Sequence, residues 1–215
     1  MTQQFFPAHL TKQNRGFTIL ELMVAIVIFT LGFLGAYLLV DSANNISIRS
    51  RDEIIGSNLM REQVELLKNL RDTNWITFRK WNSIETAKDP STSDTTFGSG
   101  YYTIENDFQV GKSIKIKKLG GFSENKDTIL SAFNASDSPI RVCIDPLGRY
   151  THSCQNTDQK TSFASFFEVT PLTTKDTTGS TIAVDNAYQI TPFFVSTDKG
   201  YHLYRMDTII TDWKR

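Results

Sequence analysis

One acidic side chain, Glu21, lies within an almost unbroken apolar stretch that runs from Phe17 to Val40. Among its 24 residues only Thr18, Glu21 and Thr30 are clearly polar. A charge at the centre of a bilayer costs roughly 3 kcal/mol on insertion scales, and charges inside membranes usually have a functional partner. We therefore expect Glu21 to pair with a cation. The alternative is a glutamate whose side chain reaches the headgroups near the helix end.

The two cysteines of the chain, Cys143 and Cys154, are close in sequence. Pro146 and Gly148 between them are typical of a turn, so the cysteines can face each other across a hairpin. A disulfide closing a loop of this size would stabilise the fold by roughly 3 kcal/mol in the chain-entropy model. Free thiols remain an alternative. So does a metal site with His152, although two cysteines and one histidine do not complete a structural zinc site.

The remaining polar residues match no catalytic pattern. The sequence has no GxSxG, P-loop, HExxH or paired CxxC motif. Its histidines are His9, His152 and His202, and nothing in the sequence nominates a nucleophile for them. Asp89 and Asp94 lack the dense oxygen-ligand spacing of a calcium-binding loop. We therefore expect a protein that is not an enzyme, with no cofactor and no metal.

The composition suits one ordinary globular domain plus an additional segment. The chain has 215 residues, of which 40% are hydrophobic and 21% charged, and Lys+Arg and Asp+Glu both count 23. No overall charge imbalance points to nucleic acid. A local cluster of Lys112, Lys115, Lys117 and Lys118 is a possible basic surface that would bind DNA phosphates in a salt-dependent way. A solvated strand face protected by lysine is the favoured interpretation.

The apolar stretch is long enough to cross a membrane as a helix. At about 1.5 Å per residue it spans roughly 36 Å, against a bilayer core of about 30 Å. The preceding segment, residues 1–16, carries Lys12 and Arg15 without an acid, which predicts a cytoplasmic N-terminus and an outside location for the rest. A cleaved secretory signal would be shorter, and a plain signal anchor would leave Glu21 unexplained.

The junction Gly16-Phe17-Thr18-Ile19-Leu20-Glu21, after a short basic leader and before an apolar run, resembles the prepilin signature of type IV pilins and type II secretion pseudopilins. The resemblance covers roughly residues 1–40. It implies that a prepilin peptidase cuts after Gly16 and methylates the new amino terminus on Phe17. It also implies that Glu21 meets the amino terminus of a neighbouring subunit, where ammonium and carboxylate compensate each other's charge in an apolar bundle.

One departure from the family pattern concerns the middle of the apolar helix. Many major pilins carry a proline about two-thirds along this segment, and residues 17–40 contain none. This absence favours a minor pilin that resembles pilus-modification subunits. Gly32 and Gly35 could loosen the helix during assembly, because glycine weakens a helix by about 1 kcal/mol relative to alanine. Close packing of small residues, Gly32 with Ala36, is an equally open interpretation.

Residues 41–75 are predicted to continue the same helix as an amphipathic stalk. Apolar residues recur there at spacings of 7, 4, 7 and 4, which places them on one narrow stripe. The stripe consists of Ile48, Ile55, Leu59, Leu66 and Leu70, widened by Met60, Val64 and Leu67, and the opposite side carries Arg61, Glu65, Lys68 and Asp72. We expect the stripe to pack on a sheet and the charged side to face solvent or a neighbour.

A polar connecting loop is predicted over residues 76–100, where Ser, Thr and Asp are frequent. Trp75, Phe78 and Trp81 lie near its start. We expect all three to pack where the helix meets the head, because aromatic side chains bury a large area. A binding cluster of aromatic residues is the alternative.

Residues 101–215 are predicted to form an antiparallel sheet. Expected strands cover Tyr101–Ile104, Lys112–Lys117, Ile140–Ile144, Phe163–Thr170, Tyr188–Val195 and Tyr201–Thr211. Asp198-Lys199-Gly200 is expected to join the last two as a hairpin turn. In the second strand a period of two places Lys115 and Lys117 on one face. One long helix followed by strands predicts an α+β fold, which agrees with the type IV pilin-like fold that the resemblance implies.

The sequence therefore predicts a structural subunit, a minor pilin, of a type IV pilus. Its expected parts are a leader (1–16), a membrane and filament-core helix (17–40), a stalk helix (41–75), a loop (76–100) and a sheet head (101–215). Expected partners are other pilin subunits, the prepilin peptidase, the pilus assembly machinery and, before assembly, membrane lipid. The protein would be a single-pass membrane protein before assembly and part of an extracellular pilus afterwards. Alternatives are a pseudopilin, a DNA-binding pilin of an uptake filament and a signal-anchored extracytoplasmic enzyme.

Overall fold

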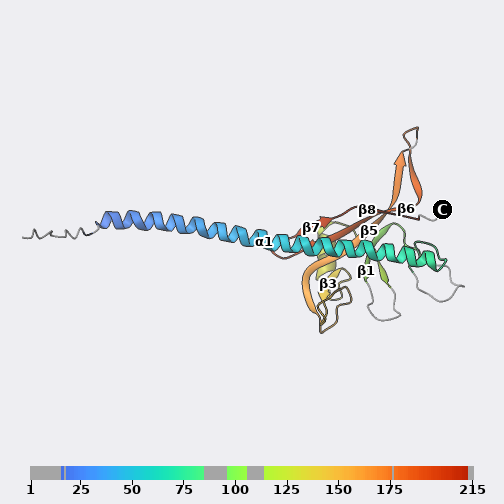
Figure 1. Ribbon diagram of the computed structural model, residues 1–215, viewed down its shortest axis with the longest axis horizontal. Coiled ribbons are helices and arrows are strands. Elements are labelled where there is room, and N and C mark those ends of the chain that lie inside the picture. The colour runs from blue at the N-terminus through green and yellow to red at the C-terminus, as the bar shows by residue number, and fades with distance from the viewer. Residues whose placement is uncertain (1–15, 17, 85–95, 106–113, 176, 213–215) are drawn as a thin grey trace, which may run out of the picture. The chain divides into compact units, whose positions relative to one another are not determined.

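The computed structural model describes residue 16 and residues 18–84, 96–105, 114–175 and 177–212. Figure 1 shows its elements along the chain. They are α1 (Ile19–Ile76), β1 (Gly100–Glu105), β2 (Lys115–Leu119), α2 (Lys126–Asn134), β3 (Arg141–Ile144), β4 (Tyr150–Thr151), β5 (Gln159–Lys175), β6 (Thr181–Ser196), β7 (His202–Arg205) and β8 (Thr208–Thr211). This order of one long helix followed by antiparallel strands confirms the predicted α+β fold.

Helix α1 covers both of the predicted helical segments without interruption. It has 58 residues and ends at Ile76, one residue beyond the predicted end of the stalk at Trp75. The chain divides into two compact units, residues 1–50 and residues 51–215. The apolar part of α1 therefore belongs to the first unit, and the stalk part from Arg51 onward belongs to the second, together with the sheet.

The sheet of the second unit is built around two long strands, β5 and β6, which pair along most of their length. β5 also pairs with β1 through residues 167–169 and with β3 through residues 159–164, so both short strands lie along the same edge of β5. β2 extends the sheet beyond β1, and β4 extends it beyond β3. β7 and β8 both pair with β6. All of these pairs are antiparallel. Along each strand, successive side chains point to opposite faces of the sheet.

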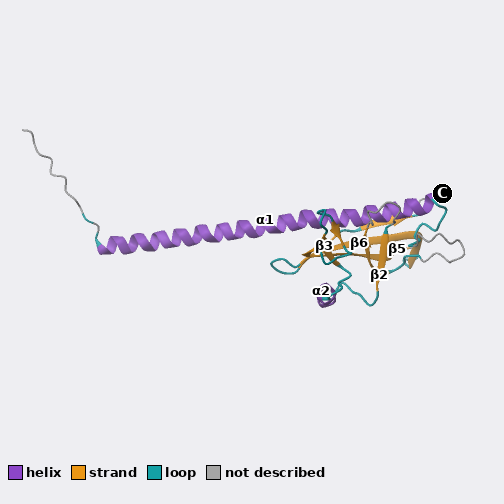
Figure 2. Cartoon of the chain, turned by 90° about the horizontal axis from the view of Figure 1, so that it is seen from below, coloured by secondary structure: helices purple, strands orange, loops and turns teal. Residues whose placement is uncertain are grey.

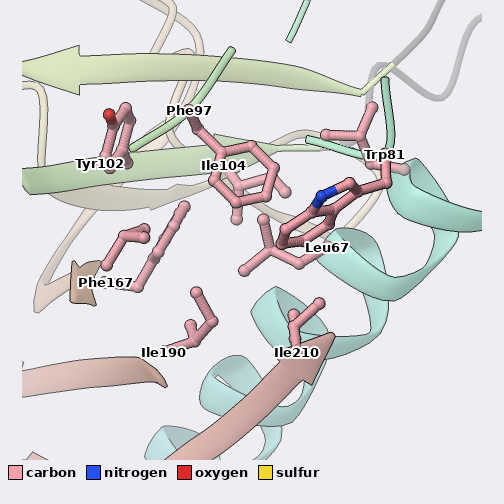
Figure 3. Packing of buried hydrophobic residues seen from close by; sticks show 10 residues of the cluster. Leu67, Trp81, Phe97, Tyr102, Ile104, Phe167, Ile190 and Ile210 are labelled. Carbon is pink, nitrogen blue, oxygen red and sulfur yellow. The ribbon is translucent and has the colours of Figure 1, made fainter. Parts of the chain in front are cut away.

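The stalk part of α1 packs on one face of the sheet. Leu67 and Leu70 lie in a core cluster with aromatic residues that include Trp81, Phe97 and Phe167 (Figure 3). Leu59 and Met60 belong to a neighbouring cluster on the same helix. Of the predicted apolar stripe, Leu59, Met60, Val64, Leu67 and Leu70 are buried and Ile55 and Leu66 are partly buried. The same part of the helix also carries buried polar side chains that the sequence pattern did not indicate, namely Asp52, Gln63 and Asn74.

The opposite face of the sheet carries the short helix α2, which the sequence did not predict. Figure 2 shows the sheet between α2 and the stalk part of α1. Ile129 and Phe133 of α2 pack on Phe166 and Phe193 of the central strands. At the start of the helix, the side chain of Asn125 accepts a 3.1 Å hydrogen bond from the backbone N–H of Asp127. Such a cap stabilises a helix of only 9 residues, which is too short for strong periodicity.

Three of the predicted local details need correction. Of the aromatic residues near the end of α1, Trp81 is buried, but Phe78 is 92% exposed and Trp75 is 37% exposed. The strand predicted from residue 112 begins at Lys115 among the described residues. The strand predicted over residues 201–211 is two strands, β7 and β8, which pair with β6 in one continuous register. Between them Met206 donates its N–H to the carbonyl of Pro192, which has no N–H to donate in return. The turn predicted at residues 198–200 joins β6 to β7.

The predicted disulfide is present. Cys143 in β3 and Cys154 after β4 are bonded, with their Cα atoms 5.5 Å apart. The intervening hairpin turns at residues 145–149, where the carboxylate of Asp145 accepts hydrogen bonds from the backbone N–H groups of Leu147 and Arg149. These bonds lower the pKa of Asp145, and the bond from the backbone N–H of Arg149 has the largest effect. Of the alternatives that the sequence left open for the two cysteines, namely a disulfide, free thiols and a metal site, the structure has the disulfide.

Candidate assembly site on the N-terminal helix

Thr18 immediately precedes helix α1 and caps its first turn. Its hydroxyl accepts a 3.2 Å hydrogen bond from the backbone N–H of Glu21, and its carbonyl accepts a 3.1 Å bond from the N–H of Leu22. A threonine side chain in this position satisfies one of the N–H groups that the first turn of a helix leaves unpaired. Thr18 and Glu21 also have the Thr-x-x-Glu spacing of a capping box, which is a sequence signal for the start of a helix.

Glu21 lies in this first turn, near the positive end of the helix dipole. The dipole stabilises a nearby carboxylate by about 0.3–1 kcal/mol. That is less than the roughly 3 kcal/mol that a charge costs inside a bilayer. Glu21 forms no ion pair with any other residue in the described part of the chain. The helix end alone therefore does not balance this charge inside a bilayer, and pairing with a cation of another subunit stays a prediction.

The other two polar side chains of the apolar segment differ from Glu21 because each has a partner within the helix. Thr18 caps the first turn, and the hydroxyl of Thr30 donates a 2.9 Å hydrogen bond to the carbonyl of Val27. A hydroxyl paired in this way costs little in an apolar medium. Of these three polar residues, Glu21 is the one whose carboxylate has no partner among the described residues.

The apolar side chains of the same segment are exposed. Within the described residues, α1 is the one helix long and apolar enough to cross a membrane, and none of its apolar window is buried. Exposed fractions range from 81% at Ile19 to 51% at Val24. Exposed apolar surface of this extent needs lipid or other protein surfaces around it. We therefore expect lipid or other protein surfaces, and not this chain's own fold, to cover the segment.

Gly32 and Gly35 lie inside unbroken α-helix. A Cβ at either position would meet nothing within 4 Å, so the fold of the single chain does not require glycine there. The two interpretations offered for these glycines, loosening during assembly and close packing against a neighbouring helix, both concern contacts outside this chain. Both stay predictions.

The other predicted site residues are distributed as follows. Gly16 is exposed and precedes the helix, while Phe17 and Lys112 lie outside the described residues. Lys115 and Lys117 point to the face of the sheet that carries α2. Lys118 points to the other face, with its Nζ 5.8 Å from the centre of the Tyr102 ring. Among the described residues, Lys118 therefore points away from the face that Lys115 and Lys117 share, and a basic surface at this strand stays a prediction.

Comparison with known proteins identifies the N-terminal part of the chain. Residues 11–37 match the family model of the prokaryotic N-terminal methylation motif. This motif is characteristic of type IV pilins and pseudopilins, and the match includes Gly16, Phe17, Glu21 and both glycines of the helix. Searches of curated proteins and of solved structures gave no match. The motif, the long apolar helix and the sheet head resemble those of type IV pilins and pseudopilins, and the motif supports a protein of that class.

This class is a structural one, which is consistent with the expectation that the chain is not an enzyme. In the described part of the chain, no group of three or more His, Cys, Asp or Glu side chains could hold a metal ion. The motif and the apolar helix are likewise consistent with insertion into a membrane before assembly. Assembly with other pilin-type subunits and processing by a prepilin peptidase follow from the motif.

Proposed function

We propose that this protein is a minor pilin, a structural subunit of a type IV pilus that is cleaved after Gly16 and methylated on Phe17. The observation that carries the proposal is the unpaired Glu21 carboxylate inside an exposed apolar helix that matches the methylation motif. The membrane holds the subunit through residues 17–40. Docking onto a filament then covers the apolar surface and supplies the missing cation, the amino terminus of a neighbour.

The energetics favour assembly over the isolated state. A lone carboxylate in an apolar environment is costly, and an ion pair with good geometry removes most of that cost. Cleavage after Gly16 would create the required amine on Phe17, four residues before Glu21. Leaving the leader in place would keep that amine from forming. Processing and docking are therefore coupled through one charge pair.

In this proposal the leader is cytoplasmic and the sheet head faces outward. The positive flank before the helix supports this orientation, and so does the disulfide, because disulfides persist outside the cytoplasm. The minor rather than major assignment is supported by the absence of proline from residues 17–40. The second candidate is a type II secretion pseudopilin, which would use the same helix and the same charge pair in a short periplasmic assembly.

DNA binding by an uptake filament is the third candidate and is less well supported. The described lysines of the basic strand do not all point to one face, since Lys118 lies over the Tyr102 ring, on the other face from Lys115 and Lys117. Salt-dependent retention of duplex DNA by the full-length protein would restore this candidate.

The first experiment is the mass of the N-terminal peptide from cells that contain a prepilin peptidase. We expect a peptide that starts at methylated Phe17. A peptide that still contains Arg15-Gly16-Phe17 would overturn the proposal and leave the chain with an ordinary membrane anchor. Sheared filaments should also contain the subunit. If the subunit is absent from them and its deletion abolishes protein secretion, the pseudopilin assignment replaces the pilin one.

The second experiment tests the charge pair. Glu21→Gln should still be cut and methylated, but its amount in sheared filaments should fall by about tenfold or more, because the ammonium of the neighbour is left without its partner. Thr30→Val is the matched control, since it removes a polar side chain that is already paired inside the helix. Equal incorporation of both variants would show that Glu21 has no role in docking.

A further inference from the structure

A polar groove of about 430 Å³ opens on the face of the sheet that carries α2. Its walls are the β1–β2 pair, the turn that follows α2, and the loop closed by the disulfide. Pockets of roughly 300–1,000 Å³ suit small ligands. The minor-pilin proposal gives this groove no role.

The register of β1 and β2 explains which side chains reach the groove. Lys117 lies opposite Thr103, and Lys115 lies opposite Glu105. Residues opposite each other in an antiparallel pair point to the same face, so all of them line the same side. The next residue, Lys118, points to the other face and is not part of the groove.

The groove wall is held rigidly. The carboxylate of Glu105 accepts hydrogen bonds from the hydroxyls of Ser153 at 2.5 Å and Thr151 at 3.4 Å. The disulfide fixes the same loop one residue further on, at Cys154. A preorganised wall lowers the entropy cost of binding a ligand.

The charges in the groove are mostly positive. Four cationic residues line it, namely Lys115, Lys117, Lys160 and Arg141, against Glu105 and Asp137. Lys115 lies 3.9 Å from Glu105, and Arg141 donates a 2.6 Å hydrogen bond to the carbonyl of Phe133. In the described part of the chain, no carboxylate lies within ion-pairing distance of Lys117 or Lys160. These two ammonium groups are therefore available to an anion.

The rest of the lining indicates which anion fits. Hydroxyl and amide side chains, among them Ser138, Gln155 and Asn156, alternate with the charges. These groups and the Asp137 carboxylate can hydrogen-bond to a ligand rich in hydroxyls. Among the described residues, no Phe, Tyr or Trp side chain lines the groove and His152 supplies its one aromatic ring, so it lacks the series of stacking surfaces on which single-stranded nucleic acids bind.

We propose that this groove binds an acidic sugar, such as a uronic acid unit of a polysaccharide. The sugar carboxylate lies between Lys117 and Lys160, and its hydroxyls donate to Asp137 and exchange hydrogen bonds with the amides of the disulfide loop. The minor-pilin assignment is independent of this proposal, since a head of either pilus type or of a pseudopilus could present the groove.

The test is calorimetric titration of the full-length protein in a nonionic detergent with trigalacturonic acid. Lys117→Gln/Lys160→Gln should weaken binding by about tenfold or more, the scale of losing charge-assisted hydrogen bonds. Lys118→Gln is the matched control, because it removes the same charge from the same strand on the other face. It should leave the affinity unchanged. All three lysines are exposed, so unchanged thermal unfolding of the variants will show that each is folded.

Four outcomes would overturn the proposal. The first is no heat of binding with trigalacturonic acid. The second is equal binding of the neutral trisaccharide of galactose, which would show that the lysines recognise no carboxylate. The third is an equal loss in Lys118→Gln, which indicates a general charge effect. The fourth is tighter binding of inorganic phosphate or of duplex DNA than of the acidic sugar, which would assign the groove to a phosphate ligand.

Discussion

The hydroxyl of Ser196 donates a 2.7 Å hydrogen bond to the carboxylate of Asp52, two residues that are 144 positions apart in sequence. Both are almost fully buried, at 0% and 3% exposure. The second oxygen of Asp52 accepts hydrogen bonds from the guanidinium of Arg51, the nearer at 3.0 Å. This carboxylate therefore ties the part of α1 around Asp52 to the end of β6.

Replacing Asp52 with alanine should lower the free energy of unfolding of the head by about 1–3 kcal/mol, because Ser196 would be left buried without its partner. Asp52→Asn keeps an oxygen acceptor and should cost less. Glu53→Ala, on the exposed side of the same turn, is the control. Urea unfolding of the full-length protein in nonionic detergent, followed by tryptophan fluorescence, measures the difference. Equal stability of the Asp52 and Glu53 alanine variants would contradict this role.

Gly56 gives a second prediction about the contact between the stalk and the sheet. A Cβ built at this position lies 2.3 Å from Cδ1 of Phe194, a ring that is fully buried. Gly56→Ala should therefore destabilise the head by about 1–3 kcal/mol through overpacking, despite the better helix propensity of alanine. Ser57→Ala changes the next residue of the helix and should be close to neutral. Chemical denaturation of both variants under identical conditions makes the comparison, and a Gly56→Ala protein as stable as Ser57→Ala would refute the clash.

The disulfide should contribute roughly 3 kcal/mol to stability, as the chain-entropy model predicts for a bridge between residues 11 apart. The Cys143→Ala/Cys154→Ala variant should lose about this amount. Adding a reductant to the wild-type protein should give a similar loss, while the double variant should not respond to it. A reductant effect that persists in the double variant would mean that the loss does not come from this bond.

His152 makes stability depend on pH. Loss of solvent around the imidazole lowers its pKa from the usual value near 6.5, although the nearby Glu105 acts in the opposite direction. Its Nδ1 is buried and has no hydrogen-bond partner among the described residues. Because the unfolded chain takes up a proton near pH 6.5 and the folded chain does so only at lower pH, the folded state loses relative stability as the pH falls below about 6.5.

The expected result is a decline in unfolding free energy between pH 7 and pH 5 that is reduced in His152→Gln. The variant comparison is needed because other charged groups line the same region. Glu62 of α1 has a pKa raised by partial burial, so its protonation favours the folded state as the pH falls. If the pH dependence is identical with and without His152, then this imidazole is not its source.

Local sequence patterns were sufficient for much of the fold. The stalk helix was predicted to within one residue of its end because its apolar spacing is sustained over many turns. The two cysteines were correctly paired, because a turn of Pro146 and Gly148 lies between them. Helix α2 was missed because 9 residues hold little more than two turns of periodicity. Phe78 was wrongly expected to be buried, since residue type alone does not reveal that this side chain points away from the head.

The sequence by itself determined the N-terminal part of this protein. A basic flank, a junction that matches the methylation motif and an apolar run with one acid are contiguous there, so a short stretch of sequence contains the whole signal. Only the tertiary structure decided how the head is arranged. Asp52 meets Ser196, and Lys117 and Lys160 share a groove that excludes Lys118, because strands distant in sequence pair in a particular register. Register depends on long-range packing, which no short stretch of sequence contains.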